Sequence, residues 1–86
     1  MIQEKTQRLE EQLRILKHTA TGIDRRKCFA ILHDALVHTR PRIRDLPYES
    51  TIQFSDLTMK AVQGQVKSGD LEVALVNMGW WLRDMN

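Results

Sequence analysis

The residue types of a cysteine nucleophile, its base and an orienting acid occur close together, at Cys28, His33 and Asp34. A thiol needs a base within hydrogen-bond reach to become a strong nucleophile. Cys28 and His33 are five residues apart, so on a helix their side chains point about 140° away from each other. They cannot form the required hydrogen bond. We therefore expect Cys28 to be a small buried hydrophobic residue.

The residues that could bind a metal ion or a phosphate group also lack the spacing that such sites need. The three histidines, His18, His33 and His38, include no pair four residues apart. Asp34 and His38 have that spacing, but two ligands are too few for a metal site, and a surface ion pair accounts for them. The four glycines stand singly, outside any glycine-rich phosphate loop. We expect no catalytic residue, no metal and no cofactor.

Basic residues suggest a different kind of site, for an anion or an acidic protein. Residues 14–44 carry eight positive and two negative side chains, a net of +6, in a chain whose overall net charge is +2. If the backbone is extended around Pro41, alternation places three guanidinium groups on one side and turns Ile43 inward. The residues predicted to contact an anion or an acidic partner are Arg25, Arg26, Arg40, Arg42 and Arg44.

Nucleic acid is the alternative partner for the basic stretch, residues 25–44. Phosphate contacts from Lys and Arg supply most of the affinity of such complexes. The modest overall charge and the lack of a glycine-containing helix-turn-helix pattern argue against this alternative. Salt separates the two hypotheses, because phosphate binding weakens steeply as salt rises and an apolar contact does not.

Length and composition are typical of one small folded domain, residues 1–86. The chain has 86 residues, of which 42% are hydrophobic and 28% charged. Its apolar runs, such as residues 73–76, are no longer than five residues, against about 20 for a membrane span. The charged N-terminus lacks the apolar stretch of a signal peptide. With a single cysteine that cannot form an internal disulfide, we expect a cytoplasmic protein with no membrane partner.

Hydrophobic periodicity predicts a helix over about residues 2–18 and a second one ending near Thr39. Between them, Thr21 and Asp24 have the spacing of a capping box. A single helix that bends at Gly22 is the alternative. The narrow apolar stripe of the first helix comprises Ile2, Leu9, Leu13, Leu16, Ala20 and Ile23; the residues expected to be buried in the second are Cys28, Phe29, Leu32, Ala35 and Leu36.

Two prolines in residues 39–50 predict a connector, with room for one helical turn after Pro41. Ser50 or Ser55 is expected to cap a third helix that ends near Lys67. Alternation over residues 52–55 leaves a short extended piece as another possibility. The apolar contacts expected from this segment are Leu57, Met59, Ala61, Val62 and Val66.

The segment KSGD predicts another break, after which Ser68 or Asp70 caps a last helix that runs to about Met85. At about 100° per residue, one arc of roughly 120° forms its core face. This face comprises Leu71, Ala74, Leu75, Met78, Trp81, Leu82 and Met85.

The adjacent tryptophans near the C-terminus then receive different roles. Trp81 lies at the edge of the core face, whereas Trp80 lies opposite it with Val73 and Val76, at i, i+3, i+7 spacing. Such a second apolar face is either buried in a central helix or binds another chain, and Trp is enriched at interface hot spots. We predict that Val73, Val76 and Trp80 bind protein, with a symmetric homodimer as the simplest assembly.

The sequence therefore predicts an all-α bundle of three to four helices, with a long N-terminal helix or helical hairpin followed by two C-terminal helices. We expect a small non-catalytic, protein-binding regulator that acts as a homodimer by masking a surface on a protein target. The alternative is a nucleic-acid-binding regulator that uses residues 25–44.

Overall fold

The computed structural model describes residues 2–80, with side chains from residue 6 onward. These residues form four α-helices and one 3₁₀ helix, and no strand occurs among them. In chain order the elements are α1 (Ile2–Thr19), α2 (Ile23–Thr39), η1 (Arg40–Asp45), α3 (Tyr48–Val62) and α4 (Ser68–Asn77). The predicted all-α bundle of three to four helices is confirmed.

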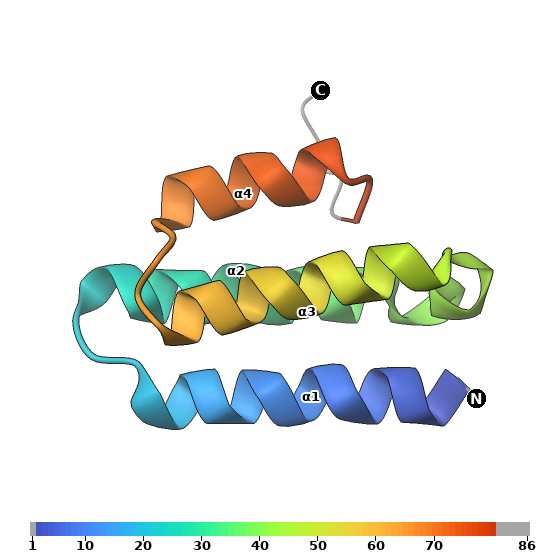
Figure 1. Cartoon of the computed structure of the whole chain (residues 1–86), viewed down its shortest axis with the longest axis horizontal. Helices are drawn as coiled ribbons and strands as arrows, with labels where there is room; N and C mark the ends of the chain where they lie inside the picture. The colour runs from blue at the N-terminus through green and yellow to red at the C-terminus, as the bar shows by residue number, and fades with distance from the viewer. Residues whose placement is uncertain (1, 81–86) are drawn as a thin grey trace.

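The helices form a flat bundle, with α2 and α3 in the middle, α1 along one side and α4 along the other (Figure 1). α1 packs mainly on α3, and α4 mainly on α2. The Cα trace spans 34 × 33 × 18 Å, so the molecule is about half as thick as it is wide. A bundle this thin cannot cover every side of its helices, and this leaves broad helical faces in solvent.

The hydrophobic core receives side chains from every helix and from the turn after α4. Of the five residues expected to be buried in α2, four are buried, whereas Phe29 is only partly buried. The core comprises Leu9, Leu13, Leu16, Cys28, Leu32, Ala35, Leu36, Ile43, Phe54, Ala61, Leu71, Leu75 and Trp80.

The break between α1 and α2 lies where the sequence predicts it. Gly22 has a φ of 85°, a left-handed conformation that glycine adopts without a Cβ clash, so the single bent helix is wrong. The predicted capping box is also wrong, because no side chain caps α2. The carboxylate of Asp24 turns instead to α4, where it accepts hydrogen bonds from Ser68.

The connector after α2 is the 3₁₀ helix η1, so the extended arrangement of its arginines is wrong. Ile43 nevertheless points inward and is buried, as expected. α3 begins at Tyr48, directly after Pro47, rather than at Ser50 or Ser55. The extended piece over residues 52–55 is wrong as well, since these residues lie within α3.

Threonines on the core side of α3 explain why its pattern is hard to recognise in the sequence. Thr51, Phe54, Thr58 and Ala61 are buried at helical spacing. Each threonine hydroxyl donates to a carbonyl of its own helix, Thr51 to Tyr48 at 2.6 Å and Thr58 to Phe54 at 3.0 Å. A buried polar side chain satisfied in this way is tolerated in a core.

Both C-terminal helices end earlier than expected, at Val62 and Asn77 rather than near Lys67 and Met85. Each is followed by a glycine in the left-handed region, Gly64 at φ 73° and Gly79 at φ 75°. Around Gly79, Trp80 N–H donates to the Leu75 carbonyl and Gly79 N–H to that of Val76, the two bonds of a Schellman motif. The expected core residues Trp81, Leu82 and Met85 lie outside the described residues.

Candidate protein-binding surface

α4 presents an exposed apolar face on the side away from the core. Leu71 and Leu75 are fully buried, whereas Val73 and Val76 are 60% and 39% exposed. The expectation that these two valines lie outside the core is confirmed. Gly69 precedes them at i, i+4, i+7 spacing, and a Cβ built there would meet no atom within 4 Å. We call Gly69, Val73 and Val76 the α4 face.

The expectation that Trp80 belongs to this exposed face is wrong. Trp80 is fully buried, and its ring stacks on Phe54 of α3 with centroids 4.3 Å apart. Its indole Nε1–H donates to the carbonyl of Ser50 at 3.1 Å. Trp80 is thus a core residue, and its contacts hold the end of α4 against α3.

The physical reason is the end of α4 at Asn77. A helical wheel assigns directions only while the helix continues, and Gly79 reverses the backbone one residue before Trp80. The sequence signal for this turn is an isolated glycine, two residues after Asn77, near the end of an apolar run. Gly79 is therefore a helix stop.

A second exposed apolar face lies on α2 and is not among the sites predicted from the sequence. Ile23 is 72% and Val37 46% exposed, and Ala30 between them is exposed too. These three residues recur every seven positions, which places them in one stripe along a helix. This spacing is visible in the sequence and could have indicated the face. Between them lie Arg26 and His33, both exposed. We call Ile23, Arg26, Ala30, His33 and Val37 the α2 face.

The five predicted anion-contacting arginines do not form one cluster. Arg25 and Arg26 lie in the first turns of α2, whereas Arg40, Arg42 and Arg44 follow its other end. The 14 positions from Arg26 to Arg40 separate the two groups by about 21 Å along the helix.

Two of the three arginines in η1 are engaged within the molecule. Arg40 forms an ion pair with Glu10 of α1. Arg42 Nη2 donates to the carbonyl oxygens of Gly79 and Trp80, both at 3.3 Å, where its charge also suits the C-terminal end of α4. Arg44 is exposed and forms no ion pair with another described residue.

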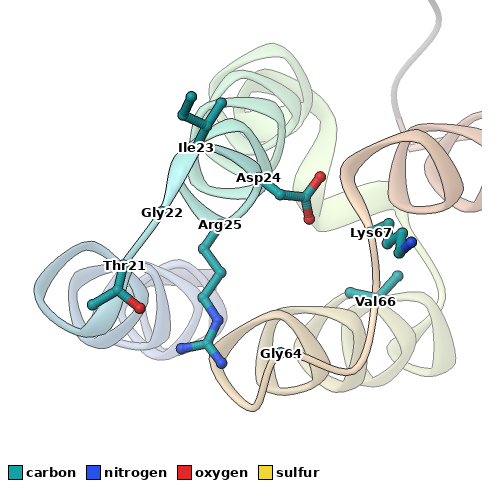
Figure 2. A pocket seen from close by; sticks show the side chains of 8 residues that line it. All are labelled: Thr21, Gly22, Ile23, Asp24, Arg25, Gly64, Val66 and Lys67. Carbon is teal, nitrogen blue, oxygen red and sulfur yellow. The ribbon is translucent and has the colours of Figure 1, made fainter.

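An open hollow of about 490 Å³ lies where α2 begins and α3 ends (Figure 2). The guanidinium of Arg25 lies against Gly64, where a Cβ would clash with it. Arg25 thereby faces the C-terminal ends of α1 and α3, whose dipoles favour a cation. The hollow is lined by Thr21, Gly22, Ile23, Asp24, Arg25, Gly64, Val66 and Lys67.

The acidic residue of the hollow, Asp24, has a structural partner. Its Oδ1 accepts hydrogen bonds from the backbone N–H of Ser68 at 3.1 Å and from the Ser68 hydroxyl at 2.8 Å. These bonds, aided by the charges of Lys67 and Lys27, lower the pKa of the Asp24 carboxyl. Asp24 therefore caps α4 from a neighbouring helix.

Cys28 lies beneath this cap, and its thiol is protected from reaction. It is fully buried, with Sγ 3.9 Å from Asp24 Oδ2 and 3.8 Å from the Val66 carbonyl oxygen. Burial and the neighbouring carboxylate raise the pKa of its thiol, which disfavours the reactive thiolate. Its expected role as a buried hydrophobic residue is confirmed.

Comparison of this chain with protein-family models, curated proteins and solved structures gives no match. Within the described residues, no three His, Cys, Asp or Glu side chains gather as metal ligands, and no helix is long and apolar enough to cross a membrane. The function is therefore inferred from the two helical faces and their charges.

Proposed function

We propose that this chain is a small, cytoplasmic, non-catalytic regulator that works by binding protein and masking the bound surface. The α4 face is the contact surface in this proposal. The observation that carries it is the exposure of Val73 and Val76 on a helix whose other side is already filled by Leu71 and Leu75. Two aliphatic side chains left in solvent on one helix favour a partner that removes them from water.

Self-association is part of the proposal. A domain of 86 residues has a small core, and pairing with another chain is a common way to bury more apolar surface. The flat shape of the bundle supports this role, since its helices leave broad faces open.

The nucleic-acid alternative loses support from the placement of the arginines. Phosphate binding needs several cations within reach of one backbone. Here Arg40 pairs with Glu10, Arg42 binds carbonyl oxygens, and Arg25 lies between helix ends at the far side of α2. Too few free guanidinium groups remain together to follow a phosphate chain.

Photo-crosslinking in the native host tests the protein-binding function. A benzophenone amino acid at position 73 is expected to give covalent adducts with protein, visible as heavier bands and identified by mass spectrometry. The matched control is position 53, since Gln53 is exposed on α3 outside both faces. Adducts of equal yield at both positions, or none at position 73, would contradict the proposal.

A further inference from the structure

We propose that the protein bound to the α4 face is a second copy of this chain, and that the α4 face of one copy docks on the α2 face of the other. This inference rests on the proposed protein-binding function and names its partner. Both faces have exposed aliphatic residues along the middle, Val73 and Val76 on one and Ile23, Ala30 and Val37 on the other. A second copy of this chain fits the α4 face because each copy carries the complementary surface, the α2 face.

The charges that flank the two faces are opposite in sign. α4 contains Asp70 and Glu72 but neither Lys nor Arg. The α2 face contains Arg26, and Lys27 beside it is also exposed; the acidic residue beside the stripe, Asp34, lies about 12 Å farther along α2. Neither cation forms an ion pair with another described residue. Docking α4 on α2 therefore places carboxylates next to cations.

The position of Arg26 also favours an acidic neighbour. Arg26 lies near the N-terminal end of α2, where the helix dipole disfavours a positive charge. Within the molecule, Asp24 of the same turn is engaged with Ser68. A carboxylate from another copy would compensate the charge of Arg26.

The same charges disfavour the pairing of two α4 faces. That contact would bring Asp70 and Glu72 of both copies together, and like charges across an interface oppose association. Two α2 faces in parallel would likewise bring Arg26 and Lys27 together, whereas an antiparallel pair would place Arg26 opposite Asp34. The contact of α4 with α2 avoids the conflict between two α4 faces.

The dimensions of the two helices agree with this contact. α4 has ten residues and is about 15 Å long, whereas Ile23 and Val37 are about 21 Å apart along α2. α4 therefore covers about two thirds of the α2 face, at the end that carries Arg26. Gly69 has no side chain, so the two backbones can approach closely at that point. Because one face holds one partner, a protein target would compete with the second copy for α4.

Charge exchange measured by sedimentation velocity tests the pairing, with the purified full chain at low salt over increasing concentration. We expect the wild type to self-associate. Asp70→Lys on α4 and Arg26→Glu on α2 should each weaken self-association about tenfold or more. An equimolar mixture of the two variants should associate again, since the reversed α4 face of one meets the reversed α2 face of the other.

Matched variants control for net charge and for folding. Asp56→Lys on α3 and Arg44→Glu in η1 make the same charge changes at exposed positions outside both faces, and they should leave association unchanged. Thermal melts of Asp70→Lys and Arg26→Glu show that the fold is retained, and Asp70→Asn provides a milder change at the same position. Val73→Asp removes the apolar contact and should abolish association without changing the melting temperature by more than a few degrees.

The remaining outcomes separate this inference from the proposed function. Self-association that is lost in Val73→Asp but unchanged in Arg26→Glu would overturn the α2 pairing and leave α4 as a protein-binding face. A wild type that stays monomeric up to its solubility limit would overturn the inference that a second copy binds the α4 face. Adducts at position 73 with another protein would then still support the proposed function. Failure of both the association and the crosslinking would remove the proposed function itself.

Discussion

The carboxylate of Asp24, in the first turn of α2, accepts two hydrogen bonds from Ser68, the first residue of α4. A helix leaves its first N–H groups without intrahelical partners, and a side-chain acceptor normally comes from the residue just before it. Here Lys67 occupies that position and forms no side-chain cap, so the acceptor comes from a residue 44 positions away. The cap therefore attaches α4 to α2 as well as stabilising its N-terminus.

Replacement of Asp24 by Ala is expected to lower the melting temperature and to loosen the start of α4. The buried thiol of Cys28 reports the loosening, because it lies beneath this cap, 3.8 Å from the Val66 carbonyl oxygen. Its reaction with a disulfide reagent should become faster, both through this loosening and because the neighbouring carboxylate no longer raises the pKa of the thiol. Asp34→Ala, an exposed acidic residue of the same helix, is the control and should leave the thiol protected.

The contribution of Asp24 depends on pH in a defined direction. The hydrogen bonds from Ser68 hold the folded-state pKa of Asp24 below its ordinary value of 3.8. A lowered pKa means that the ionised carboxylate favours folding, so its contribution is complete above 3.8 and is lost as pH falls through the folded-state value. The difference in melting temperature between wild type and Asp24→Ala should therefore be full at neutral pH and shrink in acid. A difference that grows in acid would contradict this assignment.

Replacement of Trp80 by Ala should destabilise the fold by about 3–5 kcal/mol, because it empties a fully buried site stacked on Phe54. Trp80→Phe keeps an aromatic ring but removes the indole hydrogen bond to the Ser50 carbonyl, which contributes about 0.5–1.5 kcal/mol. Urea denaturation followed by circular dichroism measures both. Val73→Ala is the surface control, with an expected change within about 0.5 kcal/mol. Equal effects of Trp80→Ala and Val73→Ala would show that Trp80 is not in the core.

Two glycines ten residues apart should respond to alanine with opposite signs. Gly79→Ala places a Cβ at a φ of 75° and should destabilise by about 1–2 kcal/mol. Gly69→Ala lies within α4 in open space, and alanine there should be neutral or stabilise by up to about 1 kcal/mol. The same denaturation experiment compares the pair. A Gly79→Ala variant as stable as Gly69→Ala would contradict the end of α4 at Asn77.

Arg42 and Arg44 are two residues apart in η1 but should behave differently. Arg42→Ala removes hydrogen bonds to two carbonyl oxygens at the end of α4 and should destabilise by about 0.5–1 kcal/mol, a small value because the side chain is exposed. Arg44→Ala should change stability by less than about 0.5 kcal/mol. Thermal melts of both variants decide whether Arg42 has this structural role.

Titration of a fluorescent DNA duplex and of a single-stranded RNA tests the nucleic-acid alternative. At low salt we expect weak binding, of the kind that any exposed cation supports. The log–log dependence on salt should indicate few contacts, since each phosphate contact on B-DNA contributes a slope of about −0.9. Tight and steeply salt-dependent binding that is lost in a variant with Arg26 and Arg44 replaced by Ala would favour that alternative over protein binding.

The sequence by itself determined the elements that depend on local pattern. The leucines of α1 recur at helical spacing, and the core residues of α2 follow the same rule, so both helices and their buried sides could be predicted. Val73 and Val76 were placed correctly outside the core, because both lie within the continuous part of α4. In each case the 3.6-residue period alone sets the direction of the side chain.

Tertiary structure decided what the period cannot specify. The helical-wheel prediction that Trp80 lies on the exposed face of α4 is wrong because α4 ends before Gly79. The indole of Trp80 instead packs beside Phe54 of α3. Asp24 has the spacing of a local cap, but the start of α4 lies close enough to take its carboxylate. The exposed side of α2 depends on the flatness of the bundle, which leaves Ile23 and Val37 without a helix to cover them. Each of these outcomes depends on which segments become neighbours, and a local period carries no information about distant segments.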